Sequence, residues 1–383
     1  MNYDRNLASK LTILFLLKGR PLFTLRYFLY MEAVKCPFHI LIADGSMDEE
    51  NKKIIDGNKH RFSHVSFKYL RYPPDNTILD FERKMADALS KIDTPYVMWN
   101  SNDDFPIVGA MLKCIDYLEQ DKKNEFVACC GQFHLFALKA NKPFGVITHL
   151  SSFHSNYYKN GNVLLSDAKN RVLSQMPFKF PFIQYSILRT NVFCKILQQL
   201  VENNITDSMV SEFFIVRSLI CNGKYNELRT ISLLFSQLFT SIWTPDFFIK
   251  KVLLGNFVNE HKTTMKLLAE QIVQSSSPNS TQANVTTVQE ELESHFVDAL
   301  NPKTLGSFLR FQSILNSQYI LRLRNVYQLF KGYLANRYLA NLSKYKLFIY
   351  LWFYSPQQAK HLLQSINAFQ KVSKHLPDDI KEK

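Results

Sequence analysis

The first third of the chain shows two alternating patterns of apolar residues. Short apolar runs end abruptly at polar or glycine-containing turns, which is typical of buried strands. The expected strands are residues 11–17, 38–43, 65–69, 97–99 and 126–130. Between these runs the apolar residues recur at helical spacing, as in Phe81, Met85 and Leu89. Strands that alternate with helices predict an α/β fold with a mostly parallel sheet flanked by helices.

The pattern changes after residue 130. Residues 131–190 lose the regular alternation, although strand-like pieces such as 145–150 remain. Beyond Asp207 the spacing is mainly helical, and a Ser-, Asn- and Thr-rich stretch near 274–288 lacks periodicity, which indicates a linker. The expected parts of the chain are an α/β domain at 1–240, a helical connection at 241–300 and a helical C-terminal region at 301–383.

The net charge of +13 is concentrated near the end of the 383-residue chain. Residues 302–376 contain eleven Lys or Arg residues, no Asp or Glu, and many interleaved aromatic residues. This composition is expected at an anionic membrane surface, where each cation contributes roughly 1 kcal/mol. Nucleic acid is the competing but less favoured partner, and aromatic residues that simply form a helical core are a third interpretation. We expect helices that also contact the membrane.

Cysteine usage and apolar run lengths indicate a cytoplasmic protein. The six cysteines show no CxxC spacing and several lie in apolar runs, so we expect reduced core thiols. The apolar run at 11–17 continues into a basic turn without a signal-peptide cleavage site. No run reaches the roughly 18 apolar residues of a membrane-spanning helix. The expected location is the cytoplasm, with peripheral contact at the inner face of the cytoplasmic membrane.

Two adjacent carboxylates, Asp103 and Asp104, follow the expected strand at 97–99. Ligands of open α/β sheets bind beyond the carboxyl ends of the strands. Mg²⁺ or Mn²⁺ that carries a nucleotide diphosphate needs only one or two protein carboxylates, because phosphate and water oxygens complete the octahedron. The pattern therefore predicts a divalent-metal site. Alternatively, both are solvated turn residues, with Asp104 capping the next helix.

A third aspartate, Asp44, ends the expected strand at 38–43 and precedes Gly45 and Ser46. Its carboxylate can accept a hydrogen bond from the imide N–H of uracil or from a ribose hydroxyl. An Asp-Gly-Ser turn alone is a weak signal. Its weight comes from the order of strand, basic turn, helix, strand, Asp-Gly-Ser, helix and strand with Asp-Asp.

This order resembles the nucleotide-binding half of glycosyltransferase family 2, the inverting GT-A type. The chain is most similar to a bacterial branch, through Ile42-Ala43-Asp44-Gly45-Ser46, Thr94-Pro95-Tyr96-Val97 and Asp103-Asp104-Phe105. The resemblance covers about residues 10–235. It implies a Rossmann-like GT-A fold and the transfer, with inversion, of a sugar from a nucleotide-sugar donor, with a UDP-sugar as the favoured donor. The implied acceptor is a saccharide or lipid-linked saccharide in surface-polysaccharide synthesis.

The resemblance also assigns residues to the donor site. Asp44 would hold the nucleobase, Asn102 a ribose hydroxyl, and Asp104, with Asp103 as second choice, the metal ion. Cationic contacts to the nucleotide and its diphosphate are expected from Lys84, Lys18 and Arg20. For Lys84, an exposed helix lysine is the competing interpretation. Asn102 departs from the family pattern, because an amide stands where the metal-binding motif has its first carboxylate.

The resemblance places the catalytic base at Glu212, with Asp207 as the alternative. Inverting transfer needs a carboxylate that removes the proton of the acceptor hydroxyl. Ser211 departs from the pattern, because it replaces an acid that usually precedes the base. Alternatively, Ser211 and Glu212 only open a helix. Two other functions stay open: a degenerate GT-A module that binds nucleotide or glycan without catalysis, and a nucleic-acid-binding protein.

Overall fold

The computed structural model describes residues 3–138, 144, 147–152, 161–176, 183–236, 258–276 and 282–299, and six positions between 364 and 372. The basic aromatic segment expected to contact membrane or nucleic acid lies almost entirely outside these residues. None of the described helices is long and apolar enough to cross a bilayer.

One half of the sheet consists of four parallel strands in the order β3-β2-β1-β4. They are β1 (Leu11–Leu17), β2 (His39–Asp44), β3 (Phe67–Arg71) and β4 (Tyr96–Asn100). All seven residues of β1 are buried, which explains its continuous apolar sequence. The expected strands are confirmed here, although β3 begins two residues later than predicted.

The other half of the sheet is mixed, in the order β4-β8-β6-β9-β5, with β7 paired to β6. The strands are β5 (Phe105–Pro106), β6 (Phe126–Leu138), β7 (Ile147–Ser152), β8 (Ile187–Arg189) and β9 (Lys224–Ser236). The expectation of a mainly helical chain beyond Asp207 is wrong for β9. This strand pairs in parallel with β6, which lies about 100 residues earlier, so local spacing does not reveal it.

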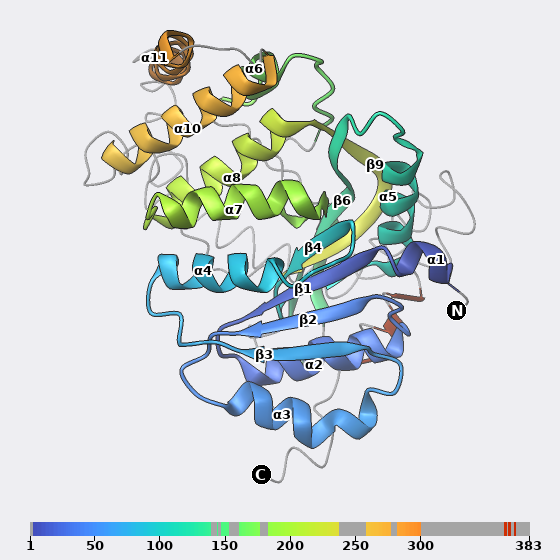
Figure 1. The fold of residues 1–383 in the computed structure, drawn as a ribbon. Helices are drawn as coiled ribbons and strands as arrows, with labels where there is room; N and C mark the ends of the chain where they lie inside the picture. The colour runs from blue at the N-terminus through green and yellow to red at the C-terminus, as the bar shows by residue number, and fades with distance from the viewer. Residues whose placement is uncertain are drawn as a thin grey trace, which may run out of the picture.

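Helices cover both faces of the sheet (Figure 1). The helices α4 (Ile78–Leu89), α7 (Thr190–Glu202), α8 (Ser208–Asn222), α10 (Val258–Ser276) and α11 (Gln282–Ala299) form a stack in which each packs on the next. The remaining α-helices are α1 (Arg5–Ala8), α2 (Pro21–Ala33), α3 (Glu50–Asn58), α5 (Val108–Gln120) and α6 (Ala168–Leu173). Short 3-10 helices are η1 (Lys59–Arg61) and η3 (Ile183–Tyr185). The α/β fold with a mixed, largely parallel sheet is confirmed.

Two details of the sequence interpretation change. The linker expected near 274–288 is narrower, because α10 extends to Ser276 and α11 begins at Gln282. Val285, Leu292 and Phe296 bury their side chains and hold α11 on the helical stack. All six cysteines are free; five are buried and Cys194 is partly exposed, as expected for core thiols.

Candidate functional site

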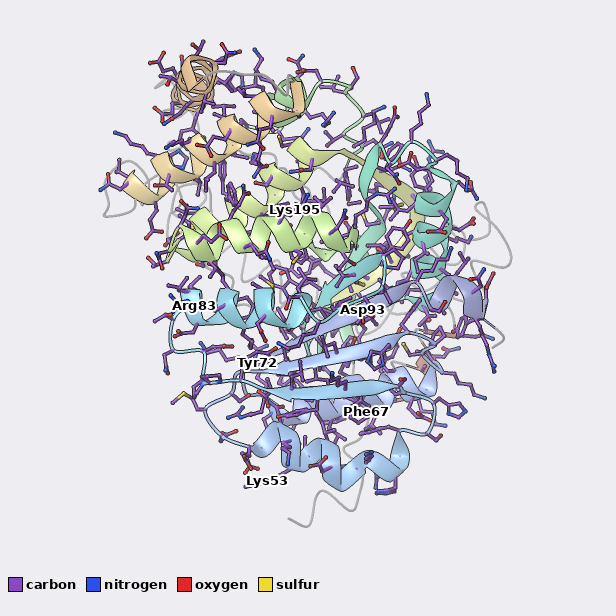
Figure 2. The ribbon with its side chains drawn as sticks, in the orientation of Figure 1. Lys53, Phe67, Tyr72, Arg83, Asp93 and Lys195 are labelled. Atoms are coloured by element: carbon purple, nitrogen blue, oxygen red, sulfur yellow. The ribbon has the colours of Figure 1, made fainter. Side chains whose placement is uncertain are left out.

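The strand order reverses between β1 and β4. The chain runs from β1 to β2 to β3 and then returns to β4 on the opposite side of β1. In open α/β sheets, ligands bind at such a switch point, outside the carboxyl ends of the strands. In Figure 2, Tyr72, just past the end of β3, marks this edge, whereas Phe67 at the start of β3 marks the opposite edge. The loops after β1, β2 and β4 are therefore the natural place for a ligand.

The loop after β1 carries two exposed cations and meets the loop after β4. Gly19 and Arg20 have φ values of 69° and 60°, a left-handed conformation that turns the chain sharply into Pro21 at the start of α2. Lys18 and Arg20 are exposed. Arg20 Nη1 lies 2.7 Å from Asp103 Oδ2. The structure therefore brings Arg20 and Asp103 into direct contact.

Asn102 is buried and holds this loop in place. Its Nδ2 donates to Thr24 Oγ1 at 3.1 Å and to the Arg20 carbonyl oxygen at 3.3 Å. Asn51 extends the network, because its Nδ2 donates at 2.9 Å to both Gly19 O and Ser46 Oγ. A carboxylate has no hydrogen to donate to a carbonyl oxygen. These two donated hydrogen bonds explain why position 102 carries an amide and not a carboxylate.

Asp44 is fully buried and its carboxylate already has protein partners. It accepts hydrogen bonds from Ser46 N at 2.9 Å, Ser46 Oγ at 2.5 Å and Tyr69 Oη at 2.5 Å. Arg71 Nη1 lies 3.4 Å from its Oδ1. A nucleobase at Asp44 would therefore have to join or replace these contacts, with Tyr69 and Arg71 as its closest neighbours.

Lys84 forms a buried ion pair that the sequence did not predict. Its ammonium group pairs with Asp75 and donates to the Leu17 carbonyl oxygen at 3.0 Å. Asp75 packs flat against Gly45, where an added Cβ would lie 2.2 Å from Asp75 Oδ1. Burial lowers the pKa of Lys84 and raises that of Asp75, while each partner opposes the shift of the other. Lys84 is 3% exposed, so it is not the exposed helix lysine that the sequence left open.

Asp103 and Asp104 face different surroundings. Asp104 is 3% exposed; it accepts hydrogen bonds from Ser236 N and Ser101 Oγ, both at 2.9 Å. Burial, and then the neighbouring Asp103, raise the pKa of Asp104. The side chain of Asp103 is 15% exposed. Of the two carboxylates, Asp103 is the one that an incoming cation reaches.

Arg26 of α2 supplies a buried positive charge behind this acidic pair. Its guanidinium carbon lies 4.8 Å from the centre of the Phe105 ring. Burial lowers the pKa of Arg26 to about 10, and the charges of Asp103 and Asp104 oppose that shift. Among the residues that the structure describes, no group of three or more His, Cys, Asp or Glu side chains is arranged to hold a metal ion.

The two expected base residues both belong to α8 but differ in role. Asp207 is the N-cap, whose Oδ1 accepts hydrogen bonds from Met209 N at 3.0 Å and Val210 N at 3.1 Å. Glu212 is partly exposed, and its Oε1 accepts a hydrogen bond from Gln184 Nε2 at 2.5 Å. Asp207 is therefore engaged as a helix cap, whereas the Glu212 carboxylate is the more accessible of the two.

Ser211, the second departure from the family pattern, is buried beside another carboxyl group. Glu82 of α4 is 2% exposed and interacts with Ser211, and burial raises the pKa of Glu82 to about 7. Glu82 lies on the same helical face as Met85 and Leu89. A charged residue within that apolar face is the sequence feature that indicates a buried carboxyl group. By contrast, Asp75 and Gln184 gave no local signal, because each acquires its partner only through the tertiary fold.

Comparisons with known proteins give only distant similarity. No protein family and no curated protein matches the sequence. Among solved structures, the chain is similar to residues 1–349 of TarS from S. aureus, with 11% sequence identity, a TM-score of 0.41, and coverage of 95% of this chain and 90% of that chain. The same TarS fragment in complex with UDP-GlcNAc gives 11% identity, the same coverage and a TM-score of 0.42. These values are too low to assign the chain to a family.

Proposed function

We propose that this chain is an inverting, metal-assisted glycosyltransferase of the GT-A type. It would move a sugar from a nucleotide-sugar donor, with UDP as the favoured nucleotide, to a saccharide or lipid-linked saccharide in surface-polysaccharide synthesis. The observation that carries the proposal is the contact between Arg20 and Asp103, at the point where the strand order reverses and in the loop that also carries the exposed Lys18. Cations beside a carboxylate at that edge suit a diphosphate and its counter-ion.

The basic residues have a clear task in this proposal. Lys18 and Arg20 would contact the two phosphates, and their charge would stabilise the diphosphate as it leaves. Asp44 ends the neighbouring strand β2 and contacts Tyr69 and Arg71 of β3, at a position that suits the base and ribose. Lys84 would have a structural task, because its hydrogen bond to Leu17 O fixes the carboxyl end of β1.

The acidic residues fit Mg²⁺ or Mn²⁺ by their chemistry, since both ions prefer oxygen ligands. Asp103 would hold the ion at the surface, in place of its present contact with Arg20. Asp104 would support the site from behind, through Ser101, whose hydroxyl lies 2.7 Å from Asp103 Oδ1 and 2.9 Å from Asp104 Oδ2. When bound, the ion neutralises charge on the leaving diphosphate.

Glu212 would act as the general base. The acceptor hydroxyl gives its proton to the Glu212 carboxylate while its oxygen forms a bond to the anomeric carbon. The bond from that carbon to the diphosphate oxygen breaks on the opposite face, and the nucleoside diphosphate leaves with the electron pair. This displacement inverts the anomeric configuration.

The competing interpretation, a degenerate binding module, rested on Asn102 and Ser211. Both departures have local structural explanations, because Asn102 donates to carbonyl oxygens and Ser211 packs beside the buried Glu82. Neither removes the carboxylate that the proposed chemistry uses, which favours catalysis over binding alone.

A thermal-shift screen of UDP, GDP and CMP, with and without Mn²⁺, tests the donor site. UDP at about 100 times its Kd should stabilise the protein by about 2.7 kcal/mol, and Mn²⁺ should enlarge the shift. We expect Asp103→Asn to lose the Mn²⁺ effect, whereas Asp116→Asn, at an exposed position on α5, should retain it. The absence of any nucleotide effect on the wild-type protein would reject the proposed function.

A further inference from the structure

The hydrogen bond between Gln184 and Glu212 joins two segments that are distant in the sequence. Gln184 belongs to η3, which leads directly into β8. Because β8 is antiparallel to β4, with Val97 opposite Leu188, the residues before β8 lie toward the carboxyl end of β4. This is the end from which the Ser101–Asp104 turn begins. Gln184 therefore brings Glu212 to the same edge of the sheet as the candidate donor site.

The η3 segment is fixed by its neighbours. The ring of Tyr185 packs on that of Trp99 in β4, with centroids 5.4 Å apart and an interplanar angle of 33°. Trp99 in turn contacts Phe81 of α4, at 6.1 Å between centroids. Gln184 itself is 2% exposed. Because η3 packs on both β4 and α8, the buried Gln184 side chain has little freedom to turn away from Glu212.

The two ends of the Gln184 amide differ in their surroundings. A charged carboxylate accepts hydrogen bonds but has no hydrogen to donate. The Gln184 amide must therefore direct Nε2, its donor, toward Glu212. The opposite atom, Oε1, is buried and accepts no hydrogen bond from the part of the chain that the structure describes. A buried acceptor without a donor is costly and calls for a ligand or an ordered water.

We propose that Gln184 is a positioning residue for Glu212, the proposed general base. The inference rests on the function proposed above and extends it to the acceptor side. The amide N–H favours the charged form of the Glu212 carboxylate. Unlike a paired Lys or Arg, it does not neutralise the charge of that carboxylate.

The test compares Gln184→Met with Gln271→Met. Methionine keeps the length of the side chain but removes both polar atoms. Gln271 is a matched control on α10, because it also bonds to α8 and α7, through Ser218 Oγ at 3.1 Å and Gln199 Oε1 at 2.7 Å, and does not contact Glu212. The assay is hydrolysis of UDP-glucose, UDP-galactose and UDP-N-acetylglucosamine with water as acceptor, measured from pH 5 to pH 9.

We expect Gln184→Met to lower kcat by about 10- to 100-fold, the size of one hydrogen bond to a charged group. The donor KM should stay unchanged, and the acid limb of the pH profile should move to higher pH, because the carboxylate becomes easier to protonate. Gln271→Met should leave the pH profile in place. Equal profiles for the two variants would overturn the inference.

A second measurement does not depend on activity. Carbodiimide couples protonated carboxyl groups to glycine ethyl ester, and mass spectrometry gives the labelling of Glu212 as a function of pH. The midpoint should move to higher pH in Gln184→Met only; an unchanged midpoint would reject the positioning role. If the wild-type protein neither binds nor hydrolyses a nucleotide sugar, the proposed function fails, while labelling still decides whether Gln184 controls the protonation of Glu212.

Discussion

Replacement of Glu212 by glutamine is expected to reduce sugar transfer by about 10²- to 10⁴-fold, the usual contribution of a positioned general base. The amide cannot take the proton of the acceptor hydroxyl, but its oxygen can still accept the hydrogen bond from Gln184. The fold and UDP binding should therefore remain. Release of UDP from a UDP-sugar, together with a UDP thermal shift, separates the two effects.

The matched variant is Asp207→Asn, which examines the alternative base. Asparagine caps helices about as well as aspartate, so the contacts to Met209 N and Val210 N should survive. We expect turnover close to that of the wild-type protein. If Asp207→Asn abolishes turnover while Glu212→Gln retains it, the roles of the two residues are reversed.

Replacement of Lys84 by methionine is expected to lower the free energy of unfolding by about 3–5 kcal/mol, because it leaves the Asp75 carboxylate buried without a counter-ion. The Leu17 carbonyl oxygen also loses its Lys84 donor. Urea unfolding monitored by circular dichroism measures the loss. The double variant Asp75→Asn/Lys84→Met should recover much of it, since it removes the buried charge.

Lys53→Met is the surface control. Lys53 lies on α3 (Figure 2) and pairs with Glu50 at 2.8 Å in an exposed i,i+3 arrangement, so its loss should change stability little. A Lys84→Met protein with wild-type stability and weakened UDP binding would contradict the buried-pair assignment. It would instead support the direct diphosphate contact expected from the sequence.

The parallel half of the fold was predictable because its information is local. Strand β1 is buried on both faces, so its sequence is apolar throughout, and the polar residues that follow each strand mark its carboxyl end. Since parallel strands bring these ends to one edge, the positions of Lys18, Arg20, Asp44 and Asp103 after β1, β2 and β4 predict one edge for all four, whereas their expected roles come from the family resemblance. The structure confirms their shared edge and adds the Arg20–Asp103 contact.

The mixed half of the sheet and the surroundings of Asp104 depend on strands that pair across long stretches of sequence. Asp104 faces inward because the neighbouring β5 pairs with β9, with Phe105 opposite Leu234, which presents Ser236 N to its carboxylate. Sequence spacing cannot reveal which of two adjacent aspartates meets a strand about 130 residues later, so the sequence centres the metal prediction on Asp104 without showing that its carboxylate is buried. The contact between Gln184 and Glu212 also joins segments that are distant in the sequence, so residue spacing does not predict it.

Hydrogen–deuterium exchange of the full chain, with and without UDP and Mn²⁺, tests the assignment of the donor site most directly. We predict slower exchange in the loops after β1, β2 and β4, around residues 18–20, 45–47 and 101–104, and no change in α10. Protection confined to α10 or other segments away from these loops, or no protection at any UDP concentration, would contradict a nucleotide-binding site at the carboxyl ends of β1, β2 and β4.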